Sequence, residues 1–79
     1  MAPVEVRVAD PGNSEEVEIL SLRVAVGQQV SLGEIVAEVA TDKVNVDVEA
    51  PIAGTVSAVR VAVGEFVAPD AILIEIDEG

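Results

Sequence analysis

The stretch "EVATDKVNVDV", residues Glu38–Val48, predicts two β-strands joined by a tight turn. Valine alternates with polar residues on both sides of Thr41-Asp42-Lys43-Val44. A period of two directs one face of a strand to a core and the other to water. Because neither Asp42 nor Lys43 is Gly or Asn, a type I turn fits better than a turn that needs positive φ. Lys43 is the only lysine of the chain, and the pattern places it at the tip of the hairpin.

The same period of two recurs in "VEVRV" from Val4 and in "ILIEI" from Ile72. Gly and Pro residues separate the alternating runs, and β-branched residues suit half-buried strands. These patterns predict an all-β fold, a flattened barrel or sandwich of two four-stranded antiparallel sheets. The eight expected strands cover residues 3–8, 17–24, 29–31, 34–40, 44–49, 54–61, 66–68 and 71–77.

The chain also repeats itself, which predicts two copies of a four-strand unit related by a pseudo-twofold axis. "RVAVGQQVSLGEIVAEVATD" from Arg23 aligns with "RVAVGEFVAPDAILIEIDEG" from Arg60 at an offset of 37 residues. The strands containing Val4 and Val44 align at an offset of 40, so the first half is expected to hold three extra residues between its first two strands. Duplicated units of this kind stack to bury a core that neither buries alone.

Composition limits what the chain can do. A length of 79 residues suits one small domain, residues 1–79. Cys and His are absent, which removes thiolates, the commonest general base and the commonest metal ligand. The net charge of −11 would repel nucleic acid, and no apolar run is long enough for a membrane span. We therefore expect no catalytic residue, no metal site, and no nucleic-acid or membrane partner.

With its flanks, the predicted hairpin resembles the lipoyl-attachment region of lipoyl domains in 2-oxo acid dehydrogenase complexes. In "EVATDKVNVDVEAPIAGTV", Asp42-Lys43-Val44 supplies the attachment turn, and Pro51 and Gly54 follow it. "VAVGQQV" and "VAVGEFV" resemble the two glycine turns of that family. The resemblance spans Val4 to Asp77 and is most like the dihydrolipoamide acyltransferase component.

This resemblance implies a non-catalytic carrier in which lipoic acid is joined to Lys43 by an amide bond. In such domains a lipoate ligase or lipoyl transferase attaches the group, and a thiamine diphosphate-dependent 2-oxo acid dehydrogenase reductively acylates it. An acyltransferase core passes the acyl group to coenzyme A, and a flavin dihydrolipoamide dehydrogenase reoxidises the dithiol. Carried over here, Thr41, Asp42 and Val44 are the flanks that these enzymes read.

The resemblance also implies a setting for the domain. The parent chain is expected to be an acyltransferase, or a dihydrolipoamide dehydrogenase with a fused carrier. Its compartment would be the bacterial cytoplasm or the mitochondrial matrix. The isolated domain is expected to be monomeric.

A second candidate region is the loop after the first strand, where the extra residues fall. The pseudo-twofold axis places the termini opposite Lys43 and directs the first strand towards the lysine. The loop is then expected beside Lys43, where a partner dehydrogenase would read it, although a tolerated surface insertion explains it nearly as well. Its residues are Asp10, Pro11, Gly12, Asn13, Ser14, Glu15 and Glu16.

Other interpretations remain open. A biotinyl carrier also modifies a hairpin lysine, but its lysine is typically flanked by methionines, and the only methionine here is Met1. A glycine-cleavage carrier protein is longer and has extra helical segments. An acidic β-domain could also dock without any modification. Finally, Asp42, Asp47 and Glu49 could suggest a metal site, although their spacing matches no EF-hand.

Overall fold

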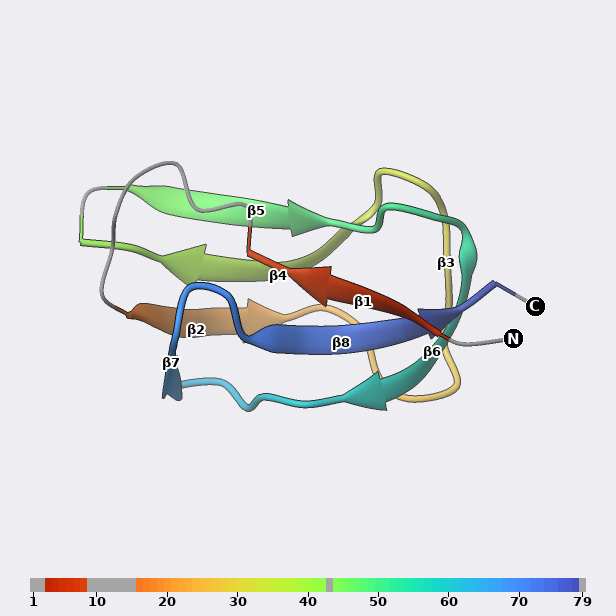
Figure 1. Cartoon of the computed structure of the whole chain (residues 1–79). Helices are drawn as coiled ribbons and strands as arrows, with labels where there is room; N and C mark the ends of the chain where they lie inside the picture. The colour runs from red at the N-terminus through yellow and green to blue at the C-terminus, as the bar shows by residue number, and fades with distance from the viewer. Residues whose placement is uncertain (1–2, 9–15, 43, 79) are drawn as a thin grey trace.

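The computed structural model describes residues 3–8, 16–42 and 44–78, and these residues form eight β-strands (Figure 1). Each expected strand is present, and its bounds differ from the expected ones by at most two residues. In the described part of the chain no helix is long and apolar enough to cross a membrane. The strands are β1 Val4–Arg7, β2 Val17–Leu22, β3 Gln29–Val30, β4 Ile35–Ala40, β5 Asn45–Glu49, β6 Gly54–Val59, β7 Phe66–Val67 and β8 Ile72–Asp77.

The strands form two four-stranded antiparallel sheets. One sheet has the order β1-β8-β6-β3 and is called the β1 sheet; the other has the order β5-β4-β2-β7 and is called the β5 sheet. Replacing each strand by the strand four places further along the chain converts one order into the other. The pseudo-twofold repeat and the predicted flattened sandwich are therefore both confirmed.

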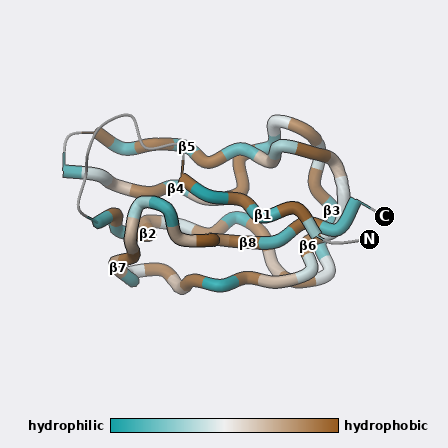
Figure 2. The backbone as a smooth tube through the Cα atoms, in the orientation of Figure 1, coloured by the Kyte–Doolittle hydropathy of each residue, from teal (hydrophilic) through white to brown (hydrophobic). Residues whose placement is uncertain are grey.

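The core lies between the two sheets and follows from the period of two. In β2, Val17 and Ile19 are completely buried, whereas Glu18 between them is half-buried. Figure 2 shows hydrophobic and hydrophilic segments alternating along the strands in the same way. Burying a Val or Ile side chain contributes about 1.5–3 kcal/mol relative to leaving it exposed. The largest fully buried side chains are Ile19, Leu73, Ile74, Ile76, Val17, Val36, Val39 and Val56.

The sheet registers correct the alignment of the first strand in each half. Val39 pairs with Val46, and its repeat counterpart Ile76 pairs with Val4. Val4 is therefore equivalent to Val46, at an offset of 42 residues rather than the expected 40. The connection from β1 to β2 is thus five residues longer than the connection from β5 to β6, not three. Because side chains alternate with a period of two, a slip of two residues leaves every side chain on the same face, and the sequence pattern cannot detect it.

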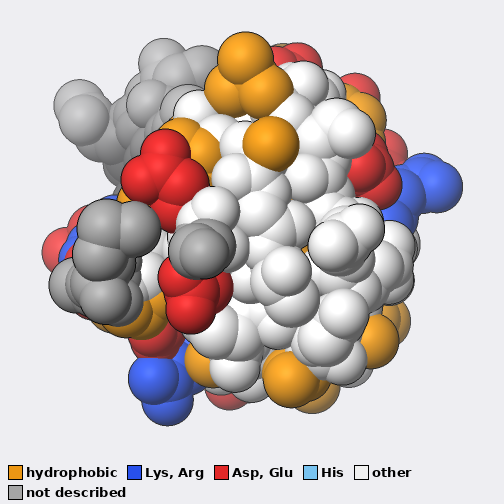
Figure 3. Space-filling view, turned by 90° about the vertical axis from the view of Figure 1, so that its right-hand side faces the viewer, with side chains coloured by type: hydrophobic (Ala, Val, Ile, Leu, Met, Phe, Trp, Pro, Cys, Tyr) orange, Lys and Arg blue, Asp and Glu red, His pale blue; other side chains and the backbone are white. Residues whose placement is uncertain are grey.

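The molecule is elongated, with extents of 35 × 20 × 19 Å. The strands run along its length, and β1 begins where β8 ends, at the end opposite the β4–β5 hairpin (Figure 1). From there β1 runs towards the hairpin, as the pseudo-twofold axis predicts. Figure 3 looks onto the end where β1 begins, which uncharged atoms largely cover.

Gly54, the first residue of β6, is needed for close packing at that end. A Cβ atom at this position would clash with the carbonyl oxygen of Asp77 and lie 2.8 Å from Cγ2 of Ile76. Because both atoms belong to β8, any side chain on residue 54 would push β6 away from its neighbour. The glycine that follows the candidate attachment turn in the sequence therefore has a packing role far from that turn.

Candidate functional site

The β4–β5 hairpin is closed by Thr41. The backbone N–H of Thr41 donates to the carbonyl oxygen of Val44 at 2.8 Å. Its hydroxyl Oγ1 donates to the same oxygen at 2.8 Å and accepts from the backbone N–H of Val44 at 3.0 Å. One side chain thus satisfies both backbone groups of Val44 and fixes the two ends of the turn against each other.

The two described neighbours of position 43 are exposed. Asp42 is in the exposed class, and the Val44 side chain is 50% exposed although it is apolar. Lys43, the predicted attachment residue, lies outside the described residues, so its role and the predicted type I turn stay predictions. Just below the turn, Val39 is completely buried. The turn is therefore held by strands that are anchored in the core, a better-fixed support than a long loop.

The beginning of β2 lies beside this turn. Glu18 pairs with Ala40, the last residue of β4, and Ala40 pairs in turn with Asn45, the first residue of β5. Glu16, the residue before β2, is exposed and is the part of the predicted partner loop that the structure describes. Asp10 to Glu15 lie outside the described residues. The far end of the loop thus emerges at the hairpin, where the sequence placed it, and its recognition role stays a prediction.

The outer face of the β5 sheet extends from the turn and carries residues that the sequence analysis missed. Glu18 pairs with Phe66 on one side and Ala40 on the other, so these side chains share one face. In the next row Glu38 pairs with Asp47. Sequence reasoning treated such acids as a solvated surface. It could not find the row because the paired residues are far apart in the chain.

The acidic residues do not form a metal site in the described part of the chain. No group of three or more His, Cys, Asp or Glu side chains comes close enough there to hold an ion. Asp47 and Glu49 share the outer face of β5, where both are exposed. The metal interpretation of Asp42, Asp47 and Glu49 therefore gains no support.

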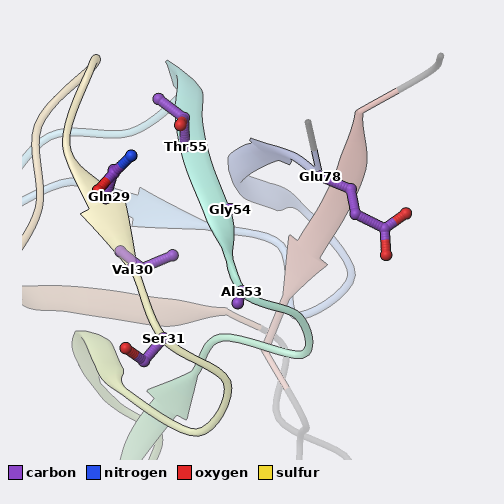
Figure 4. A pocket seen from close by; sticks show the side chains of 7 residues that line it. All are labelled: Gln29, Val30, Ser31, Ala53, Gly54, Thr55 and Glu78. Atoms are coloured by element: carbon purple, nitrogen blue, oxygen red, sulfur yellow. The ribbon is translucent and has the colours of Figure 1, made fainter.

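A surface depression lies at the other end of the molecule. It is formed by β3 and the segment around the start of β6, and Glu78 at its edge points away from the other side chains (Figure 4). Because the hairpin is at the opposite end, this depression is separate from the candidate attachment turn. Its lining residues are Gln29, Val30, Ser31, Ala53, Gly54, Thr55 and Glu78.

A family model matches this fold and hairpin. Residues 4–76 match the Biotin_lipoyl model, whose description is "Biotin-requiring enzyme". The chain belongs to this biotin- and lipoyl-attachment family. Within the family it is a lipoyl domain of the acyltransferase type, a small carrier that is not itself an enzyme, as the sequence predicted.

Individual relatives support the lipoyl branch over the biotinyl one. The chain is 32% identical over 71 residues to the dihydrolipoyllysine-residue acetyltransferase component of the pyruvate dehydrogenase complex of Cupriavidus necator, covering 90% of this chain and 13% of that protein. It is 33% identical over 75 residues to the same component of Mycoplasma genitalium, covering 94% of this chain and 20% of that one. The chain thus spans a fifth or less of these relatives.

A solved structure shares the fold. The lipoyl domain of the 2-oxoglutarate dehydrogenase complex from Azotobacter vinelandii superposes with a TM-score of 0.76, covering 100% of this chain and 99% of that one. The sequence identity is 20%, so this likeness shows the fold alone.

Proposed function

We propose that the chain is a swinging-arm carrier in which lipoate is amide-linked to Lys43. The observation that supports this proposal best is the turn closed by Thr41, whose exposed flanks Asp42 and Val44 border the only lysine in the sequence. When bound, the dithiolane of the lipoyl group accepts an acyl group and the electrons that accompany it, while the protein supplies orientation and delivery.

The residues of the hairpin fit that task. An amide at an exposed turn needs one amine and free access for the modifying enzyme, and the described flanks on both sides are exposed. The described depression lies at the far end of the molecule, so its walls do not border the turn. A tether of this kind raises the effective concentration of the carried group at each enzyme in turn.

The partners are proposed from the relatives, which are acetyltransferase components of the pyruvate dehydrogenase complex. We assign the chain to an acyltransferase parent in a bacterial cytoplasm. The enzymes that would meet the arm are a lipoate ligase, a thiamine diphosphate-dependent 2-oxo acid dehydrogenase, the acyltransferase core and a flavin dihydrolipoamide dehydrogenase. The loop of Asp10 to Glu16 is proposed as a contact for the dehydrogenase, since Glu16 emerges beside the hairpin.

A two-step mass measurement tests the carrier role. The domain is incubated with lipoate and a lipoate ligase, and then with a 2-oxo acid and its thiamine diphosphate-dependent dehydrogenase. The mass should rise once for the lipoyl group and again for the acyl group, and the Lys43→Arg variant should show neither step because it lacks the amine. A domain that is never lipoylated, or a variant that still is, would refute the proposal.

The flanks and the loop have separate tests. Replacing Asp42 and Val44 by methionine should raise modification by a biotin ligase relative to the parent, because it supplies the flanks typical of biotinyl carriers. Deleting five residues from the loop would make its length match the β5–β6 connection. This deletion should leave lipoylation unchanged and slow acylation, and equal acylation rates would show that the loop is a tolerated insertion.

A further inference from the structure

The two sheets carry an acid pair at equivalent positions on their outer faces. In the β5 sheet Glu38 of β4 lies directly opposite Asp47 of β5. In the β1 sheet Glu75 of β8 lies directly opposite Glu5 of β1, at the equivalent place. Directly opposed side chains in an antiparallel sheet have Cβ atoms about 5 Å apart, and like charges there repel. The fold therefore contains an internal control for what surrounds such a pair.

The β1 sheet neutralises its pair with two arginines. An Nη2–Oε1 distance of 2.6 Å joins Arg7 to Glu5. Arg60 approaches Glu75 with its Nη2 at 2.6 Å and its Nε at 2.7 Å from the same carboxylate oxygen. Each acid of this face thus has its own cation.

The β5 sheet lacks both arginine contacts in the part of the chain that the structure describes. Arg7 pairs with Ile72, and the equivalent residue, which pairs with Ile35, is Glu49. The first cation is therefore replaced by another acid. The equivalent of Arg60 is Arg23, which is exposed and forms no ion pair with any described carboxylate.

A further acid and an aromatic complete the difference. Glu18 stands where the β1 sheet has Thr55, since both pair with the equivalent end of the neighbouring strand. Phe66, the one aromatic residue of the chain, pairs with Glu18 and is 58% exposed, whereas its counterpart is Gln29. We call the resulting surface the acidic face; it comprises Glu18, Glu38, Asp47, Glu49 and Phe66.

We propose that the acidic face is the docking surface for a positively charged protein surface with an apolar pocket for Phe66. Resting on the carrier function proposed above, we assign that surface to the thiamine diphosphate-dependent dehydrogenase that acylates the arm. Charge complementarity selects this occupant: a cationic partner supplies the neutralisation that Arg7 and Arg60 provide on the other sheet. An exposed aromatic beside charges is the composition of a binding hot spot.

The position of the face explains how docking would help the carrier. Its first row contains Ala40 and Asn45, the residues on either side of the Thr41–Val44 turn. A partner seated on this row holds the turn at its own surface and brings the attached arm to its active site. Opposite charges on the two surfaces also steer the encounter, which raises the association rate at low ionic strength.

A matched pair of double variants tests the proposal. The first variant, Glu38→Gln with Asp47→Asn, removes two charges from the acidic face. The control, Glu75→Gln with Glu5→Gln, removes two charges from the equivalent positions of the β1 sheet, so both variants have the same net charge. Both are fully lipoylated, checked for folding by thermal melting, and acylated by the 2-oxo acid dehydrogenase from the same organism that acylates the parent domain fastest.

The expected result is a change in KM confined to the acidic face. The first variant should lose about tenfold in kcat/KM at low ionic strength through a higher KM, and the loss should shrink as salt is added. Phe66→Gln, which installs its counterpart from the β1 sheet, should raise KM at every salt concentration. The control should match the parent within about twofold, since exposed charges far from the contact act weakly.

The other outcomes separate the docking surface from the carrier function. Equal kcat/KM for the first variant and the control would overturn the acidic face as a docking surface and leave the carrier function intact. Slower lipoylation of the first variant with unchanged acylation would make the ligase the occupant and overturn the assignment. A lipoylated parent that no 2-oxo acid dehydrogenase acylates would overturn the carrier function itself.

Discussion

The β1 sheet and the β5 sheet agree in their interiors and differ on their surfaces. Val39 and Ile76 are equivalent and both completely buried, as are Val36 and Leu73. On the outside, by contrast, Arg7 is replaced by Glu49 at the equivalent position. The packing of one sheet on the other demands apolar side chains from both halves, whereas water tolerates many side chains. Differences between the outer faces are therefore the places where one half has acquired a task that the other lacks.

The largest expected effect concerns a place where the interiors themselves differ. Gly54 begins β6, and its counterpart Val17 begins β2 with a completely buried side chain. Gly54→Ala should destabilise the domain by about 3 kcal/mol, because the added methyl group clashes with the backbone of Asp77. In a domain of this size such a loss lowers Tm by more than about 10 °C. The exposed neighbour Ala53→Ser serves as the control, and an unchanged Tm for Gly54→Ala would contradict the close approach.

The next effect belongs to the turn that distinguishes the hairpin end. Thr41→Val keeps the shape of the side chain but removes the hydroxyl that contacts both backbone groups of Val44. The loss in the free energy of unfolding should be about 1–1.5 kcal/mol, measured by urea denaturation. Thr41→Ser keeps the hydroxyl and should recover most of this stability. Equal losses for the two variants would show that the hydroxyl does not close the turn.

A smaller effect should separate the equivalent arginines. Arg60→Gln removes the ion pair with Glu75 and should cost about 0.5–1 kcal/mol, a range already reduced for solvent screening because the Arg60 side chain is 57% exposed. Arg23→Gln removes no ion pair among the described residues and should leave the stability within about 0.3 kcal/mol of the parent. If urea denaturation gives the same value for both variants, the asymmetry between the sheets has no energetic content.

The smallest effects should have opposite signs at equivalent acids. Asp47→Asn relieves the repulsion with Glu38 and should raise stability by a few tenths of a kcal/mol at low salt. Glu5→Gln removes the ion pair with Arg7 and should lower stability by a similar amount. Added salt should shrink both differences, and it should raise the Tm of the parent because it screens the repulsion from a net charge of −11. Changes of the same sign would contradict the charge comparison.

The strands could be predicted from the sequence because their period of two and the glycine turns between them are local signals. The offset of β1 from β5 could not, since shifts of 40 and 42 residues put the same side chains inside. The surface row from Phe66 through Glu18 to Ala40 depends on pairing between distant segments. β7 is also only two residues long, which gives no period to detect.

The candidate site divides in the same way. The turn was predictable, because Asp42 and Lys43 interrupt a valine alternation that continues on both sides. That Thr41 closes it through both backbone groups of Val44 was not, since the hydroxyl contact depends on the conformation of the turn. Likewise, the sequence shows Arg23 and Arg60 as identical repeats, and only the packing shows that Arg60 alone of these two reaches a described carboxylate.

Trypsin mapping of the lipoylated domain tests the central claim most directly. The chain has four basic residues, Arg7, Arg23, Lys43 and Arg60, and trypsin cleaves after each when it is unmodified. Acylation of the lysine amine blocks cleavage there. The account predicts that a fully lipoylated sample yields one peptide of residues 24–60 carrying the added mass, and that the unmodified domain yields 24–43 and 44–60. Peptides 24–43 and 44–60 from the fully lipoylated sample, with the added mass elsewhere, would contradict it.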